Sequence, residues 1–143
     1  MAKVTWRGGA LIAPVPPAMI SCGTMEESNI ITVAWTGILG TVPPKTYISV
    51  RPRRHSYNII KERGEFVINL TTESLIHAAD YCGMYTGAKV DKFTACNLTK
   101  EEVPDFSCPM IAEAPLSLAC RVTDVIPMGS HDMFIADVVS VHV

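Results

Sequence analysis

The segment from Asn29 to Ser56 constrains the fold most, because it joins two strand patterns to a basic corner. Residues 30–34 form a largely apolar run with β-branched side chains, which predicts a buried strand. A second strand pattern, at residues 47–50, follows the Pro43-Pro44 pair, which we expect to fix an extended turn. Glycines at 37 and 40 are expected to loosen the chain between these strands.

The basic corner lies at residues 51–56, where three arginines, a histidine and a serine stand within six residues. Ser56 is a favourable N-cap residue, and we expect it to begin a helix that ends at Gly64. Free N–H groups at a helix start, beside guanidinium groups, form a site for anions. The corner therefore indicates a phosphate-bearing ligand. A solvated basic turn is the alternative, because no glycine-rich phosphate loop is present.

Length and composition limit the possible classes of protein. The 143 residues suit one domain with a sizeable core, and the net charge of −2 leaves no broad basic face for nucleic acid. No apolar run is long enough to span a membrane, and the N-terminus lacks the apolar core of a signal peptide. We therefore expect a cytoplasmic protein that binds neither nucleic acid nor a membrane.

The five cysteines do not form a recognisable framework. They are Cys22, Cys82, Cys96, Cys108 and Cys120, and no two are spaced as C-x-x-C. A disulfide framework and a zinc site are therefore not expected, and no metal site is predicted. Most of these cysteines should be small buried apolar residues.

The remaining patterns predict a mainly β protein, a closed antiparallel barrel with short peripheral helices. We expect two short strands within 10–23, a strand at 65–70, a helix from Thr71 or Thr72 to Cys82, single helical turns near 89–93 and 99–102, and a hairpin of 115–123 with 133–143.

Four segments resemble the flavin reductase-like domain family, whose fold is the FMN-binding split β-barrel. They are SNIITVAWTGIL, YISVRPRRHSYNIIKERGEFVINLTTE, DYCGMYTGAKVDKF and GSHDMFIADVVSVHV, and within the family the chain is most similar to flavoredoxin. The resemblance implies one FMN-binding domain over residues 1–143 and a homodimer with flavin sites near its interface. Relatives continue beyond the last strand, so we expect this chain to lack their C-terminal segment.

The resemblance and the residue chemistry together predict a cofactor site of eleven residues. These are Asn29, Thr32, Trp35, Thr36, Ser49, Arg51, Arg54, Ser56, Cys82, Gly83 and Lys92. Arg51, Arg54 and Lys92 are expected to neutralise the phosphate, and the hydroxyls of Thr36 and Ser49 to bind it or the ribityl chain. The residues alone leave an alternative for Lys92, in which Asp91 pairs with Lys89 and Lys92 is solvated surface.

One departure from the family concerns the electron donor. His131 stands in Gly-Ser-His, where the family has Gly-Asp-His near the nicotinamide side of the flavin, and Ser130 replaces the Asp. The expected function is therefore either an NAD(P)H:flavin oxidoreductase or a flavoredoxin-like carrier that takes electrons from a redox protein. A flavin-free binding barrel is a third alternative.

Overall fold

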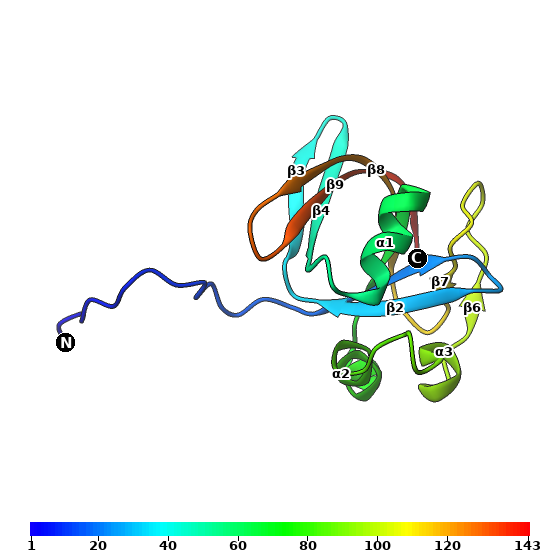
Figure 1. The fold of residues 1–143 in the computed structure, drawn as a ribbon, viewed down its shortest axis with the longest axis horizontal. Coiled ribbons are helices and arrows are strands. Elements are labelled where there is room, and N and C mark those ends of the chain that lie inside the picture. The colour runs from blue at the N-terminus through cyan, green and yellow to red at the C-terminus, as the bar shows by residue number, and fades with distance from the viewer.

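Seven strands form one antiparallel sheet in the computed structural model, which describes residues 1–143 (Figure 1). The order across the sheet is β2-β1-β5-β8-β9-β4-β3. The strands are β1 (Ala18–Gly23), β2 (Ser28–Val33), β3 (Thr36–Thr41), β4 (Pro44–Val50), β5 (Glu65–Leu70), β8 (Ser117–Pro127) and β9 (Asp132–His142). The predicted mainly β, split-barrel fold is confirmed, and so is the long β8–β9 hairpin.

The prediction that the barrel is closed is wrong, because the hydrogen bonding of the sheet does not join its two edge strands. β2 and β3 are the two edge strands, and only Ala34 and Trp35 separate them along the chain. Across this corner the Ser49 N–H of β4 donates to the Trp35 carbonyl at 3.0 Å. One edge of β2 therefore lies beside the end of β4 without pairing to it along its length.

Short helices cover the two faces of this sheet. They are α1 (His55–Arg63), α2 (Ile76–Met84), α3 (Lys92–Ala95) and the 3-10 turn η1 (Glu73–Leu75). In Figure 1, α2 and α3 lie together on the opposite side of β2 from α1. None of these helices combines the length and apolarity needed to cross a membrane.

Strands β1 and β2 are buried on both faces, which explains their continuous apolar runs. On one face Ile20 joins Tyr57 of α1 in the main core. On the other face Met19 packs with Ala79 of α2 and Phe93 of α3 in a second cluster. The two clusters hold all three helices against the strands that lead to the basic corner.

Three predictions about where strands and turns lie are wrong. Residues 10–17 form no strand; they are exposed and continue the N-terminal segment that runs away from the body in Figure 1. Pro14, Pro16 and Pro17 lack the N–H groups that a sheet ladder needs. Residues 99–102 form no helical turn, because β6 (Lys100–Glu101) pairs with β7 (Met110–Ile111) instead.

The third error is the loosened segment with Gly37 and Gly40, which is strand β3. Gly37 lies under the ring of Tyr47, and a Cβ atom at this position would come within 3.2 Å of the ring. The glycine therefore permits close packing between β3 and β4 rather than breaking the strand.

Candidate functional site

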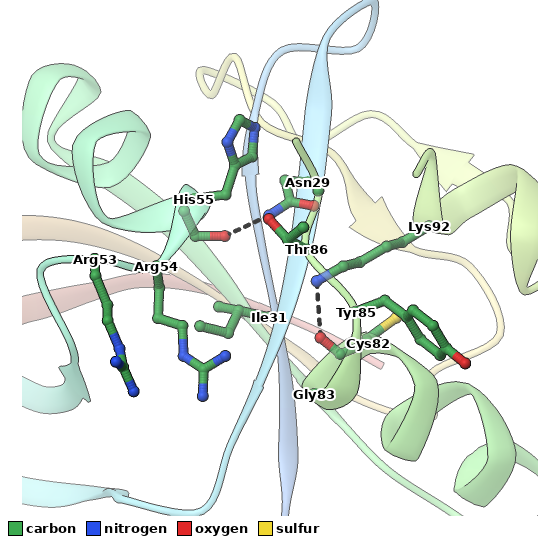
Figure 2. A pocket seen from close by; sticks show the side chains of 12 residues that line it. Asn29, Ile31, Arg53, Arg54, His55, Cys82, Gly83, Tyr85, Thr86 and Lys92 are labelled. Carbon is green, nitrogen blue, oxygen red and sulfur yellow. Dashed lines mark hydrogen bonds between the residues drawn. The ribbon is translucent and has the colours of Figure 1, made fainter. Parts of the chain in front are cut away.

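Two adjacent cavities gather ten of the eleven predicted site residues. The helix pocket, about 220 Å³, lies at the start of α1 and is lined among others by Asn29, Arg54, Ser56, Cys82, Gly83 and Lys92 (Figure 2). The strand pocket, about 270 Å³, lies between β2 and the end of β4. Its lining includes Ile31, Thr32, Val33, Ala34, Trp35, Ser49, Arg51, Arg54 and His131. Arg54 and Ile31 line both cavities, which therefore form one elongated site.

The start of α1 presents free N–H groups to the helix pocket. The helix begins after Arg54, and no side chain caps it. Ser56 lies inside the first turn, so its prediction as the N-cap is wrong; its buried hydroxyl instead accepts a hydrogen bond from Asn29 Nδ2 at 2.8 Å. The N–H groups of a first helical turn have no partner within the helix, and here His55 and Ser56 line the cavity. The expected anion-binding helix start is therefore available, with Arg54 at the N-cap position and no capping side chain.

Asn29 is fixed in place by two neighbours from distant parts of the chain. Its amide donates to Ser56 of α1, and a Cβ atom at Gly87 would collide with its side chain. Gly87 therefore lets the loop after α2 pack directly on the start of β2. This close approach forms the rim of the helix pocket opposite α1.

Lys92 is the most unusual residue of the site, because its charge is buried without a carboxylate. Only 4% of the residue is exposed, and Nζ donates to the Ile30 carbonyl at 2.6 Å and to the Cys82 carbonyl at 2.8 Å. Burial lowers the pKa of this ammonium group. An ammonium group has three N–H donors, so one remains for a ligand in the pocket that Lys92 lines.

The alternative that left Lys92 on a solvated surface is wrong. Asp91 does not pair with Lys89; its carboxylate caps α3 by accepting the backbone N–H and the hydroxyl of Thr94. This cap turns Lys92 toward β2 and α2. In Figure 2 its side chain reaches into the pocket from the side opposite Arg53 and Arg54.

The site carries positive charge that no acidic side chain balances. The chain has one salt bridge, between Lys45 and Asp137, and neither residue lines either pocket. Desolvation lowers the pKa of His131, and the nearby positive charges of Arg51 and Arg54 lower it further. A protein of net charge −2 therefore holds a local cationic field at this one elongated site.

The strand pocket offers aromatic surface and an unpaired strand edge. The rings of Trp35 and His131 contact each other with centroids 4.5 Å apart. The hydroxyl of Thr32 already donates to the Ala79 carbonyl at 2.5 Å, so this side chain ties β2 to α2. The backbone of β2 pairs with β1 on one side only, which leaves polar groups along the other side for a ligand.

Thr36 is the predicted site residue that the structure does not bring to either pocket. Its hydroxyl donates to the Tyr47 carbonyl at 2.7 Å, across the β3–β4 pair. Sequence reasoning left out Arg53, His55, Tyr85 and Thr86, which line the helix pocket. Arg53 and His55 belong to the basic corner. Tyr85 and Thr86 reach the pocket only through the packing of the loop after α2.

Comparison with known proteins identifies the family. A model of the flavin reductase like domain matches residues 12–143. The chain belongs to the flavin reductase-like domain family.

Within the chain, no group of three or more His, Cys, Asp and Glu side chains is arranged to hold a metal ion.

Three individual proteins illustrate how far the similarity extends. An uncharacterised protein of Archaeoglobus fulgidus is 30% identical over 117 residues, which cover 82% of this chain and 66% of that protein. The structure of flavoredoxin from Desulfovibrio vulgaris (Miyazaki F) superposes with a TM-score of 0.91 at 29% identity, covering 99% of this chain and 76% of flavoredoxin. An FMN-binding protein from Thermus thermophilus gives a TM-score of 0.86 at 22% identity, covering 99% and 78%. The chain thus spans less than two thirds of the length of the first relative.

The lowered pKa of His131 leads to a prediction that needs no cofactor. Replacing Arg51 with Gln removes a positive charge that opposes the imidazolium form, so the pKa of His131 should rise toward its ordinary value. Nuclear magnetic resonance of the imidazole protons across a pH series measures this pKa. Arg63→Gln, at the far end of α1, is the matched control and should leave it unchanged. Equal titration curves for all three proteins would show that Arg51 exerts no field on His131.

Proposed function

We propose that the chain binds FMN across the two pockets and transfers electrons through it. The helix pocket takes the phosphate and the strand pocket takes the ring system. Lys92 is the observation that carries this proposal, because its buried charge has a donor to spare and no acidic partner.

The residues of the helix pocket suit a phosphate group. A phosphate monoester carries a charge of about −1.5 to −2 at neutral pH and accepts several hydrogen bonds. Lys92, Arg54 and the uncapped start of α1 supply donors and positive charge from three directions. Buried unpaired charge is costly in a folded protein, so an anionic ligand would relieve the electrostatic penalty of Lys92.

The strand pocket suits the ring end of the same ligand. Trp35 and His131 provide flat apolar surface, and Arg51 lies beside them. The Ile30 carbonyl points out of the sheet toward Lys92, and backbone groups alternate along a strand, so those of Thr32 point to the same open edge. A flavin supplies the electron chemistry when bound, and the protein holds it, orients it and excludes water.

The similar proteins support the choice of cofactor. Flavoredoxin, and the protein from Thermus thermophilus that is described as FMN-binding, share this fold over nearly the whole chain. FMN has a single phosphate group, which matches the single cluster of hydrogen-bond donors at the start of α1. FMN is therefore the cofactor that we propose.

Two roles remain for a flavin in this site, an NAD(P)H-dependent oxidoreductase and an electron carrier. We favour the carrier, in which a redox protein is the donor. Ser130 stands where the family has Asp, and its hydroxyl lies 2.9 Å from His131 Nδ1. The serine therefore engages the histidine rather than presenting a carboxylate at the nicotinamide side.

A homodimer is also part of the proposal. Large apolar side chains are exposed on the N-terminal segment and on the β3–β4 hairpin, including Trp6 at 74%, Ile38 at 68% and Val42 at 96%. Exposed apolar surface of this kind is typical of protein–protein interfaces. We expect sedimentation equilibrium to give twice the 15.6 kDa mass of one chain, and a mass of 15.6 kDa would contradict the dimer.

The phosphate assignment is tested by comparing FMN with riboflavin, which lacks the phosphate. In Lys92→Met the loss of a charged hydrogen bond should weaken FMN binding roughly 10- to 100-fold, as measured by flavin fluorescence titration. Riboflavin binding should change by less than about twofold, because no phosphate contact is lost. Lys89→Met, an exposed lysine of the same connection, is the control and should bind both flavins like the parent protein.

Two results of this titration would count against the assignment. If Lys92→Met weakened riboflavin as much as FMN, the lysine would support the pocket's structure without contacting the phosphate. If it weakened neither, the phosphate would lie elsewhere.

The carrier is distinguished from the oxidoreductase by anaerobic mixing. The FMN-loaded protein should keep its visible absorbance for minutes with NADH or NADPH, and lose it rapidly with a reduced redox protein such as a ferredoxin. Rapid bleaching by a pyridine nucleotide would instead identify the oxidoreductase.

A further inference from the structure

Two of the five thiols face each other beside the helix pocket, and one of them, Cys82, lines it. Cys82 Sγ of α2 and Cys96 Sγ, which follows α3, lie 4.0 Å apart. Both belong to the apolar cluster that packs α2 and α3 against the sheet. A disulfide bond is about 2.05 Å long, so the two sulfurs are roughly 2 Å from bonding distance.

Lys92 connects this thiol pair to the pocket. Its Nζ donates to the carbonyl of Cys82 at 2.8 Å, and the Cys96 N–H donates to the Lys92 carbonyl at 3.0 Å. Its charge also acts on both thiols. The ammonium group and the two cysteines are thus parts of one short structural unit, so a backbone shift at Cys82 or Cys96 that brings the sulfurs together also moves the groups that Lys92 contacts.

We propose that Cys82 and Cys96 form a reversible disulfide on oxidation by hydrogen peroxide, and that this bond weakens anion binding in the helix pocket. The thiol chemistry is independent of the ligand, whereas its effect on FMN rests on the proposed function. Reduced flavins react with oxygen to form hydrogen peroxide, so the flavin chemistry proposed for this site also produces the oxidant.

Exposure decides the order of the two steps. Burial raises the pKa of the Cys82 thiol to about 12, whereas Cys96 is partly exposed and reachable by peroxide. The Cys96 thiolate attacks one peroxide oxygen; an S–O bond forms, the O–O bond breaks, and the leaving hydroxide takes a proton to become water. Cys82 sulfur then attacks the Cys96 sulfenic acid. The S–S bond forms, the S–O bond breaks, and the departing hydroxide takes the Cys82 proton as a second water.

Binding and oxidation should oppose each other. The positive charge of Lys92 would stabilise both the negative charge of a phosphate in the pocket and that of a neighbouring thiolate. If the disulfide lowers the affinity for a ligand, the ligand must disfavour the disulfide by the same factor at equilibrium. Ligand occupancy should therefore protect the thiols.

The test begins with flavin-free protein, a small excess of hydrogen peroxide and a count of free thiols after denaturation. We expect the count to fall from five to three, peptide mapping to find one crosslink joining Cys82 to Cys96, and dithiothreitol to restore all five. The oxidised protein should bind FMN roughly tenfold more weakly than the reduced protein, the loss expected for one displaced charged hydrogen bond. Bound FMN should slow the thiol loss.

Two variants identify the pair. Cys96→Ala, which does not line either pocket, should keep the FMN affinity of the reduced parent and should not lose that affinity after peroxide treatment. Cys120→Ala is the matched control, because it removes a thiol from the main core and should still lose two thiols and FMN affinity.

The possible failures separate the two proposals. Five free thiols after peroxide, or a crosslink between other cysteines, would overturn the disulfide. An unchanged FMN affinity in protein with the mapped crosslink would overturn its effect on the pocket. If reduced protein bound no FMN while the crosslink still formed, the proposed cofactor would fail, and inorganic phosphate would replace FMN as the probe of the pocket.

Discussion

The hydrogen bonds of the Lys92 ammonium group hold the site together. They join the open edge of β2, through the Ile30 carbonyl, to the end of α2, through the Cys82 carbonyl. An ammonium group without a carboxylate partner is an expensive feature of a protein interior, and proteins seldom keep one without a use for it. β2 and α2 supply the carbonyl groups that bind this ammonium group, and α3 carries the lysine itself. The geometry of the pocket therefore depends on this one charged group.

The incomplete closure of the sheet is what leaves room for a ligand. A closed barrel would use the backbone groups of every strand, whereas here β2 retains one free edge beside the end of β4. The same corner places Trp35 and His131 over the gap and leads the chain through Arg51 into α1. An apolar surface, a polar strand edge and a cationic helix start therefore follow each other within one elongated site.

Patterns that depend on neighbouring residues could be predicted from the sequence. The strand at 65–70 matches β5 at both ends, and Gly64 ends α1 in the left-handed conformation, as its lack of a Cβ atom favours. The 115–123 and 133–143 patterns correctly predicted the β8–β9 hairpin, although its turn is shorter than expected. These features are determined by alternation and turn chemistry that can be seen within a few residues.

Features that depend on distant residues could not be predicted in the same way. Ser56 does not cap α1, because its hydroxyl is engaged by Asn29, 27 residues earlier in the chain. The burial of Lys92 depends on carbonyl groups of β2 and α2, and only the family resemblance indicated its place. The strand at 36–41 was missed because the reason for Gly37, the ring of Tyr47, lies on another strand.

A crystal structure of the protein with FMN tests the central claim most directly. The account predicts phosphate oxygens within hydrogen-bond distance of Lys92 Nζ and of the His55 and Ser56 N–H groups, with the ring beside Trp35. A phosphate bound away from both Lys92 and the start of α1 would contradict it.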